Sequence, residues 1–377
     1  MKSDDPAILG LGVAAPDRPF SQEEALTLAL ELSPPETEDQ RRQIELIYRR
    51  SGVDFRGTEA AHSVSASGTQ SDAPSFAPAS LRCPSGPGTA ARMAIYAKRA
   101  TSLAIRSTRA ALADSRVHPG EITHLVSASC TGFASPGWDI DLVEALGLPR
   151  TVQRTNVGFM GCHAAINALR LAEAFSRADK AARVLVCCTE VCSVHFRYDA
   201  RPDQVVANAL FADGSSAAVV GAWGGAWGGV GAGEAEFACV SSTSSRLIED
   251  SRDQMGWAVG DHGFEMNLGI ELTGTIRRRA GEWVREWLDS EELTIEEVGS
   301  WAVHPGGPKI LSAIGEALCL PGCALDASRQ VLGLHGNMSS ATVLFVLEAM
   351  RSRRELRLPC VLMSFGPGIT AEGLLLR

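Results

Sequence analysis

The chain has 377 residues, of which 45% are hydrophobic and 21% are charged, so it can bury one large core or two closely packed domains. A formal net charge of -9, with no local basic patch, excludes a nucleic-acid partner. No stretch approaches the roughly 20 apolar residues of a membrane span, and the first ten residues, MKSDDPAILG, lack the apolar region of a signal peptide. We therefore expect a cytoplasmic protein without a membrane span.

Two segments of biased composition interrupt the chain. Residues 57–88 are rich in Ser, Ala, Pro, Gly and Thr without periodicity, which predicts a long surface loop or a disordered insert. The glycine-rich stretch GAWGGAWGGVGAGEAEF, from Gly221, lacks the strand-then-helix context of a phosphate-binding loop. We interpret it as a connector between an N-terminal half, residues 1–225, and a C-terminal half, residues 226–377.

The ten cysteines do not indicate disulfides or a metal site. Most lie in apolar runs such as VLVCCTEVC, which is typical of buried thiols. Cys319 and Cys323 are spaced as C-x3-C, but no second Cys/His pair stands at zinc-site spacing. We expect no metal.

An internal repeat with a constant offset of 175 residues links the two halves. It superposes GFMGCHAAINALRLAEA, from Gly158, on GLHGNMSSATVLFVLEA, from Gly333, so that Cys162 coincides with Asn337. The same offset places HLVSAS over SWAVH, which ends at His304, and ARVLVCCTE over LRLPCVLMSF. Three elements in one register indicate a structural duplication.

Each repeat is typical of a strand, a loop, a long amphipathic helix and another strand, with runs apolar enough for sheets buried on both faces. The predicted fold class is α/β in two similar halves. The helices after Cys162 and Asn337 should start at equivalent points beside a pseudo-twofold axis, which would bring Cys162, Asn337 and His304 together.

These three residue types support nucleophilic chemistry. A cysteine at a helix N-terminus beside an imidazolium favours the thiolate, so we expect the pKa of Cys162 to lie well below about 8.5. His304 and the Asn337 amide would form a two-donor hole for a thioester oxygen. Taken singly, a cysteine like Cys162 is more often a buried structural thiol, and a histidine like His304 is usually a satisfied core residue; the repeat register weakens both alternatives. Papain-like hydrolases share Cys, His and Asn, but their Cys-Gly-Ser/Ala-Cys context is absent.

Five motifs together resemble the type III polyketide synthases, the chalcone-synthase-like family: GFMGCHAAINALRLA, NALFADGSSAAVVG, WAVHPGGPKIL, GLHGNMSSATVLFVL and SFGPGITAE. The resemblance implies a five-layered αβαβα thiolase fold, a homodimer, and acyl-CoA and malonyl-CoA as substrates with no further cofactor. It also implies repeated decarboxylative condensation. One alternative is a β-ketoacyl carrier-protein synthase of the initiating kind, with a single condensation. Another is a non-catalytic partner subunit, which the intact triad disfavours.

The resemblance assigns roles to five residues. Cys162 would accept the acyl group, while His304 and Asn337 would stabilise the enolate formed when malonyl-CoA loses carbon dioxide. Phe211 and Phe264 match the gatekeeping phenylalanines, whose apolar rings would disfavour the malonyl carboxylate. The alternative for both rings is ordinary core packing.

The resemblance also implies a set of substrate-cavity residues. They are Thr131, Ser135, Cys192, His195, Met255, Ser339, Gly366, Pro367 and Gly368. The small Cys192 would open a tunnel for an aliphatic chain, whereas Met255 would narrow the cavity and limit the number of extensions. We therefore expect a fatty acyl-CoA starter and a triketide or tetraketide pyrone or alkylresorcinol.

Coenzyme A requires cations at the tunnel mouth. Arg49 and Arg50 occupy the region where the family binds the nucleotide phosphates, and Lys309 follows the HPGGP turn. The alternative is solvated surface charge.

Overall fold

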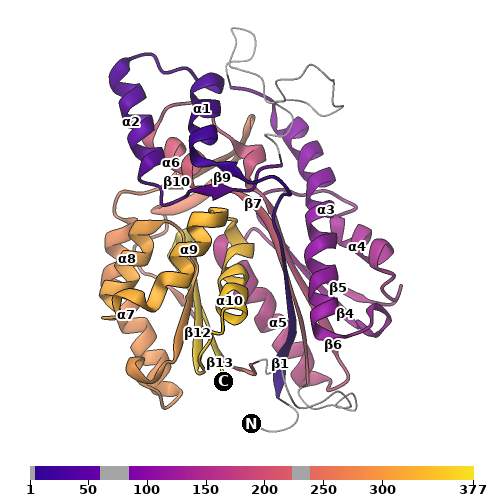
Figure 1. The fold of residues 1–377 in the computed structure, drawn as a ribbon. Helices are drawn as coiled ribbons and strands as arrows, with labels where there is room; N and C mark the ends of the chain where they lie inside the picture. The colour runs from indigo at the N-terminus through magenta and orange to yellow at the C-terminus, as the bar shows by residue number, and fades with distance from the viewer. Residues whose placement is uncertain (1–4, 60–84, 223–237) are drawn as a thin grey trace.

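A computed structural model describes residues 5–59, 85–222 and 238–377 (Figure 1). The insert predicted at 57–88 lies mostly outside the described residues, and so does nearly all of the glycine-rich connector. The boundary expected at residue 225 also falls there and stays a prediction.

The N-terminal half is built on a five-stranded sheet. Its strands in spatial order are β1 (Pro6–Ala14), β7 (Asp213–Ala222), β6 (Arg183–Val191), β4 (His124–Ser129) and β5 (Gln153–Gly158). Strand β4 runs parallel to β5 and β6, whereas β7 is antiparallel to β6 and β1. Helices α3 (Thr89–Ser115) and α4 (Trp138–Leu146) lie on its outer side, and α5 (Ala164–Ala178) covers the inner face.

The C-terminal half repeats this plan on a four-stranded sheet. Its strands in spatial order are β11 (Ser300–Val303), β12 (Cys360–Gly366), β13 (Thr370–Leu376) and β8 (Val240–Leu247). Strands β11 and β12 are parallel, and the other pairs are antiparallel. Helix α10 (Thr342–Ser352) lies on the inner side, and α7 (Leu272–Ser290) and α8 (Pro308–Ala317) lie on the outer side.

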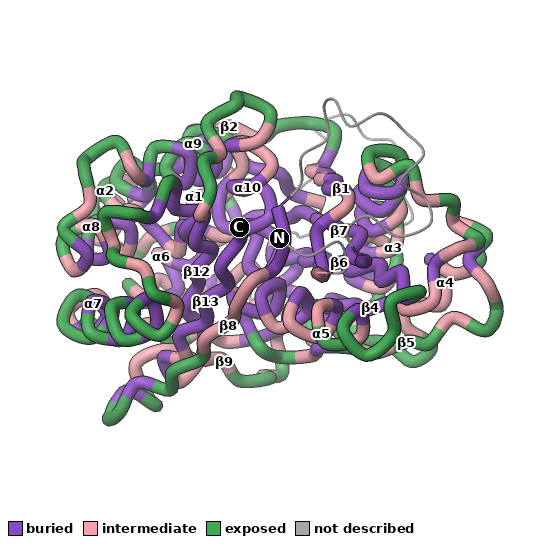
Figure 2. Tube along the Cα trace, turned by 90° about the horizontal axis from the view of Figure 1, so that it is seen from below, coloured by how far each residue is buried: buried purple, intermediate pink, exposed green. Residues whose placement is uncertain are grey.

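Strands β6, β7, β11 and β12 are buried on both faces because most of their residues are apolar or small. In β6, Val184 and Val186 join a central core with α5 and α10, while Leu185 and Cys187 face α3. In β12, Leu362 joins the central core, whereas Val361 and Met363 point to the other face and join the core formed with α7. Figure 2 shows the strands buried and the exposed residues on the peripheral helices and loops. The resulting helix, sheet, helix, sheet, helix order confirms the predicted five-layered α/β fold.

Smaller elements cover one end of the two sheets. They are β2 (Phe20–Ser21), α1 (Gln22–Leu32), α2 (Glu38–Arg49), β3 (Phe55–Arg56), α6 (Pro202–Leu210), the hairpin β9 (Met255–Gly260) and β10 (Gly263–Leu268), and α9 (Asp326–His335). Among the described helices, none is long and apolar enough to cross a membrane.

The repeat register holds for the strands but not for the helix starts. Helix α5 begins two residues after Cys162, whereas α10 begins five residues after Asn337. The backbone N–H of Asn337 donates to Leu210 O (2.9 Å), and Ala212 N–H donates to Asn337 O (2.9 Å). These bonds hold Asn337 in an extended segment and delay the helix, so the prediction of equivalent helix starts was wrong.

Leu344→Ala should lower the free energy of unfolding by about 2–5 kcal/mol, because Leu344 is fully buried in the central core and the deletion leaves a cavity. Leu334→Ala is the matched control, since that side chain is 45% exposed on α9. Chemical denaturation of both variants checks this; equal losses would contradict the central position of Leu344.

Candidate active site

Cys162 lies where the two halves of the chain meet. It occupies a 3-10 turn, Gly161–His163, between β5 and α5. Gly161 has φ +73, and a Cβ there would lie 2.5 Å from Cδ of Pro367, which follows β12. Only glycine permits this conformation and this approach. The Ser364 hydroxyl also donates to the Cys162 carbonyl (3.0 Å), so the second sheet fixes the turn that carries the thiol.

His304 extends the pairing of β11 with β12, because its backbone N–H donates to Met363 O (2.8 Å). Its side chain is buried, and neither ring nitrogen has a hydrogen-bond partner among the described residues. Such an unsatisfied buried group costs about 1–3 kcal/mol, which a bound partner would recover. The imidazole is therefore available for a substrate group.

Asn337 is oriented by its own backbone. Its side-chain Oδ1 accepts a hydrogen bond from the N–H of Ser339 (2.9 Å), which leaves the amide nitrogen as the donor end toward Cys162. Ser339 has φ +46, and its hydroxyl lies 3.7 Å from the Cys162 sulfur. The predicted donor end of Asn337 is thus directed by a local contact.

One cavity contains the three predicted catalytic residues. Cys162, His304 and Asn337 line it together with Phe211, Met255, Ser339 and Pro367. The rest of the wall is almost wholly apolar: Leu210, Trp257, Met266, Leu268, Leu272, Ile276, Ile310 and Phe365, with Cys130 and two glycines. We call this space the catalytic cavity.

Burial opposes both charges of the expected ion pair. It raises the pKa of the Cys162 thiol to about 12, against smaller opposing effects of hydrogen bonds from Ser339 and Asn337. Burial, with the neighbouring His163, also lowers the pKa of His304 to about 3. The structure therefore favours a neutral thiol and a neutral imidazole in the same cavity, contrary to the low thiol pKa expected from the helix terminus. A thiolate and an imidazolium would have to form together, with the proton passing from Cys162 to His304.

A second pocket adjoins the catalytic cavity. Thr131, Cys192, His195 and Phe264 line it, and it extends to Leu32 and other apolar residues of α1. The two spaces share the wall residues Cys130, Phe211, Trp257, Met266 and Ser339. Polar side chains line it as well, among them Arg56, Arg197, Gln204 and Asn208, and we call this second space the acyl pocket.

Sequence reasoning missed Glu190, which lies at the end of β6 and is fully buried. Its carboxyl group accepts hydrogen bonds from Thr131 Oγ1 (2.7 Å), Thr131 N–H (3.1 Å), Cys130 N–H and the Ser340 hydroxyl. Burial raises its pKa. In the sequence, the signal that could have identified Glu190 is a single carboxylate within the apolar run VLVCCTEV. Glu190 fixes the loop that separates the two spaces.

Comparison with known proteins identifies the family. Residues 3–224 match the model of the chalcone and stilbene synthase N-terminal domain, and residues 239–377 match the C-terminal domain. The "Alpha-pyrone synthesis polyketide synthase-like Pks18" of Mycobacterium tuberculosis is 33% identical, over 98% of this chain and 90% of the relative. The chain is a type III polyketide synthase of the chalcone and stilbene synthase family.

Other relatives agree with this assignment. The 1,3,6,8-tetrahydroxynaphthalene synthase of Streptomyces peucetius is 35% identical, over 73% of this chain and 72% of the relative. The crystal structure of PKS-I from the brown alga Ectocarpus siliculosus superposes with a TM-score of 0.88 at 29% identity, covering 100% of this chain and 99% of that one. The resemblance inferred from the motifs is confirmed, and the initiating carrier-protein synthase is set aside.

Three predicted cavity residues of the synthase line neither space. Ser135 is exposed in the loop after β4. Gly366 is buried behind the Cys162 turn, where a Cβ would lie 2.3 Å from His163 Cδ2. Gly368, at φ +72, turns the chain beyond Pro367. In a single chain, the two glycines shape the backbone around the cavity.

The three predicted phosphate-binding cations lie on the surface. Arg49 ends α2 and forms a 3.6 Å ion pair with Glu45, Arg50 follows it, and Lys309 is exposed near the start of α8. A Cβ at Gly52 would lie 3.5 Å from Pro308, so the segments carrying Arg50 and Lys309 are neighbours.

His304→Ala should move the pH profile of Cys162 alkylation to higher pH, because the thiol then loses its proton acceptor while burial still raises its pKa. Iodoacetamide labelling with peptide mass spectrometry measures the midpoint for Cys162, and the exposed Cys319 is the internal reference. Identical Cys162 midpoints in both proteins would show that the thiol does not transfer its proton to His304.

Proposed function

We propose that this synthase condenses a fatty acyl-CoA starter with malonyl-CoA, using Cys162 as the nucleophile. The Cys162 sulfur attacks the starter thioester and releases coenzyme A, leaving the acyl group on the enzyme. Malonyl-CoA then loses carbon dioxide, and the C2 carbon of the resulting acetyl-CoA enolate attacks the Cys162 thioester. The sulfur leaves, and a β-ketoacyl-CoA two carbons longer is formed, ready for another round.

The observation that supports this mechanism best is the unsatisfied His304 imidazole in the same cavity as Cys162 and Asn337. A neutral imidazole N–H and the Asn337 amide N–H would together stabilise the enolate oxygen. The Asn337 amide is oriented by the contact with Ser339, and the backbone of His304 is held by its bond to Met363 of β12, so we expect little reorganisation on substrate binding.

The two phenylalanines have different surroundings. Phe211 lines both spaces, and its backbone forms a parallel bridge with Asn337. We assign it the role beside the malonyl carboxylate, whose charge an apolar ring disfavours. Phe264 lines only the acyl pocket, where it stacks between His195 and Trp257. It is better suited to contact the starter.

The starter assignment is supported by the acyl pocket. Beyond Cys192 and Thr131, this pocket is lined by Phe20, Ala25, Leu28, Leu32, Phe196 and Ala207. An aliphatic chain buried there gains about 0.8 kcal/mol for each CH₂ group. The relative named for alpha-pyrone synthesis agrees with a pyrone product, and an alkylresorcinol would need the same starter. Met255 lines the catalytic cavity and would restrict the number of extensions.

An exposed apolar patch supports a homodimer. Phe133, Phe159 and Met160 are 54%, 51% and 45% exposed, and the two phenylalanine rings contact edge to face. This patch adjoins the Cys162 turn and includes the loop that precedes Ser135. A second copy of the chain would cover it.

The coenzyme A phosphates would be bound by the exposed cations Arg49, Arg50 and Lys309.

Cys162→Ala should abolish loading of the starter but retain decarboxylation of malonyl-CoA, since that step needs His304 and Asn337. Asn337→Ala should instead reduce decarboxylation by about 10²–10³-fold, the usual cost of one oxyanion donor. Release of ¹⁴CO₂ and intact-protein mass spectrometry measure the two steps. Full polyketide output from Cys162→Ala would refute the nucleophile.

Cys192→Phe should reduce turnover of a long acyl-CoA by at least about tenfold, because the larger ring would fill the apolar pocket beside Thr131. Turnover of butanoyl-CoA by the same variant is the control, since a four-carbon chain needs much less of the pocket. Preference of the unmodified enzyme for coumaroyl-CoA over fatty acyl-CoA would contradict the starter assignment.

A further inference from the structure

Two polar side chains of the acyl pocket are engaged by backbone at both ends. His195 Nε2 lies 2.6 Å from the carbonyl oxygen of Thr131, and its Nδ1 accepts a hydrogen bond from the N–H of Phe264 (3.0 Å). The Asn208 amide accepts from the N–H of Arg197 (3.0 Å) and donates to the carbonyl of the same residue (2.8 Å). These groups already have partners, so they do not point to a ligand.

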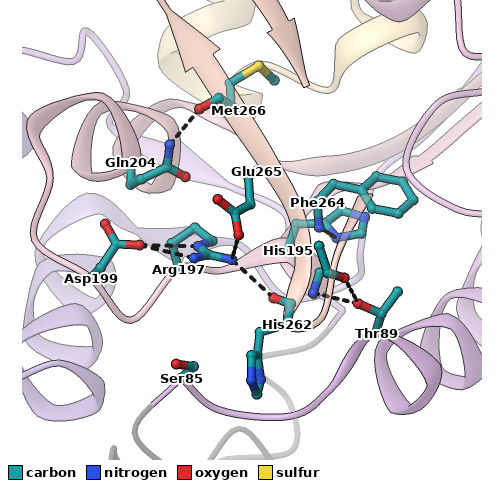
Figure 3. A network of polar contacts seen from close by, with 12 residues as sticks. Ser85, Thr89, His195, Arg197, Asp199, Gln204, His262, Phe264, Glu265 and Met266 are labelled. Carbon is teal, nitrogen blue, oxygen red and sulfur yellow. Dashed lines mark hydrogen bonds and ion pairs between the residues drawn. The ribbon is translucent and has the colours of Figure 1, made fainter. Parts of the chain in front are cut away.

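The charge of Arg197 is also matched. Figure 3 shows its guanidinium paired with Asp199 (3.2 Å) and Glu265 (3.3 Å), and donating to the carbonyl of His262 (3.4 Å). Two carboxylates therefore neutralise the cation at this position. An acyl chain that ends in a carboxylate gains little by reaching it.

Gln204, on α6, differs from these residues. It is 1% exposed, and its Nε2 donates to the carbonyl of Met266 and to the Asp203 carboxylate (3.0 Å). Both partners can only accept, so they fix the nitrogen there and turn the oxygen away. Figure 3 shows the Gln204 oxygen on the side away from the Met266 bond. This Oε1 has no hydrogen-bond partner among the described residues, which leaves a buried acceptor without a donor in the pocket wall.

Arg56 carries a second unsatisfied group in the same wall. Its terminal nitrogens donate to backbone carbonyls at the end of α6, those of Asn208 (2.6 Å), Ala209 (2.8 Å) and Phe211 (3.0 Å). Its Nε is buried and has no partner within the part of the chain that the structure describes. Asn208 follows Gln204 by one helical turn, so both groups belong to the α6 side of the pocket.

We propose that Gln204 and Arg56 form a polar subsite of the acyl pocket, which takes a hydroxyl group carried by the starter acyl chain. The hydroxyl donates its hydrogen to Gln204 Oε1, and the Nε–H of Arg56 suits an oxygen acceptor. A plain alkyl chain leaves both groups unsatisfied, and a carboxylate has no hydrogen to give to Gln204. The inference rests on the proposed acyl-CoA starter and narrows it to hydroxylated acyl groups.

The test compares dodecanoyl-CoA with the same thioester hydroxylated at the third carbon, in mid-chain or at the last carbon. The kcat/KM for each starter, with malonyl-CoA as extender, is measured for the parental enzyme, Gln204→Met and Glu265→Gln. Gln204→Met keeps the length of the side chain and removes the acceptor. Glu265→Gln is the matched control, because it weakens the Arg197 pair on the same hairpin and lines neither space.

We expect the parental enzyme to favour one of the hydroxylated starters over dodecanoyl-CoA by about tenfold or more, the scale of leaving a buried acceptor unpaired. Gln204→Met should abolish this preference, and Glu265→Gln should keep it. The ratio compares two starters in one protein. A general structural defect would lower both values and leave their ratio unchanged.

Equal kcat/KM values for dodecanoyl-CoA and all three hydroxylated starters in the parental enzyme would overturn the proposal, as would a preference that persists in Gln204→Met. If Gln204→Met does not fold, as judged by thermal unfolding, Gln204→Asn replaces it, since the shorter side chain withdraws the acceptor. Failure of the starter assignment is seen separately, as rejection of every fatty acyl-CoA. The pair of cinnamoyl-CoA and coumaroyl-CoA, which differ by one hydroxyl group, then decides on the subsite by the same ratio.

Discussion

Desolvation of the catalytic cavity is the constraint on which the rest of the structure depends. The cavity forms where the ends of two sheets meet, and its contacts cross between halves: Pro367 on Gly161, and the Ser364 hydroxyl on the Cys162 carbonyl. Apolar side chains of α7, α8 and the β9–β10 hairpin then close it. Burial in this largely apolar space disfavours charge, so we expect each polar group inside to be neutral or to be paired with a group of the substrate.

This constraint changes how the nucleophile has to work. Burial shifts the pKa values of both Cys162 and His304 against charging. The same burial would destabilise a malonyl carboxylate and would strengthen N–H donors toward an enolate oxygen. One property of the cavity thus suppresses charge in the resting enzyme and favours the charge redistribution that the proposed condensation requires.

The sequence predicts what is local and repeated. The apolar runs of β4, β6, β11 and β12 appear in one register and amphipathic helices lie between them, which is enough for the fold class and for the convergence of Cys162, His304 and Asn337. It does not predict the local structure or the pKa values that depend on contacts with distant segments of the chain. Bonds from Leu210 and Ala212 delay the helix after Asn337, and burial by the whole fold overrides the local helix terminus at Cys162. The bonds that engage His195 come from residues 64 and 69 positions away.

Iterative synthesis adds a geometrical requirement to the chemical one. A chain that grows by two carbons in each round must move within spaces whose shared wall is Cys130, Phe211, Trp257, Met266 and Ser339. A wall of loose loops would yield to the chain and give a broad range of products. Here the Cys130 end is fixed by the buried Glu190, and the hairpin that carries Trp257 and Met266 is bonded to α6 and to the Arg197 segment. Both sides of this shared wall are therefore anchored in the interior, so the wall offers the growing chain a defined volume under the proposed function.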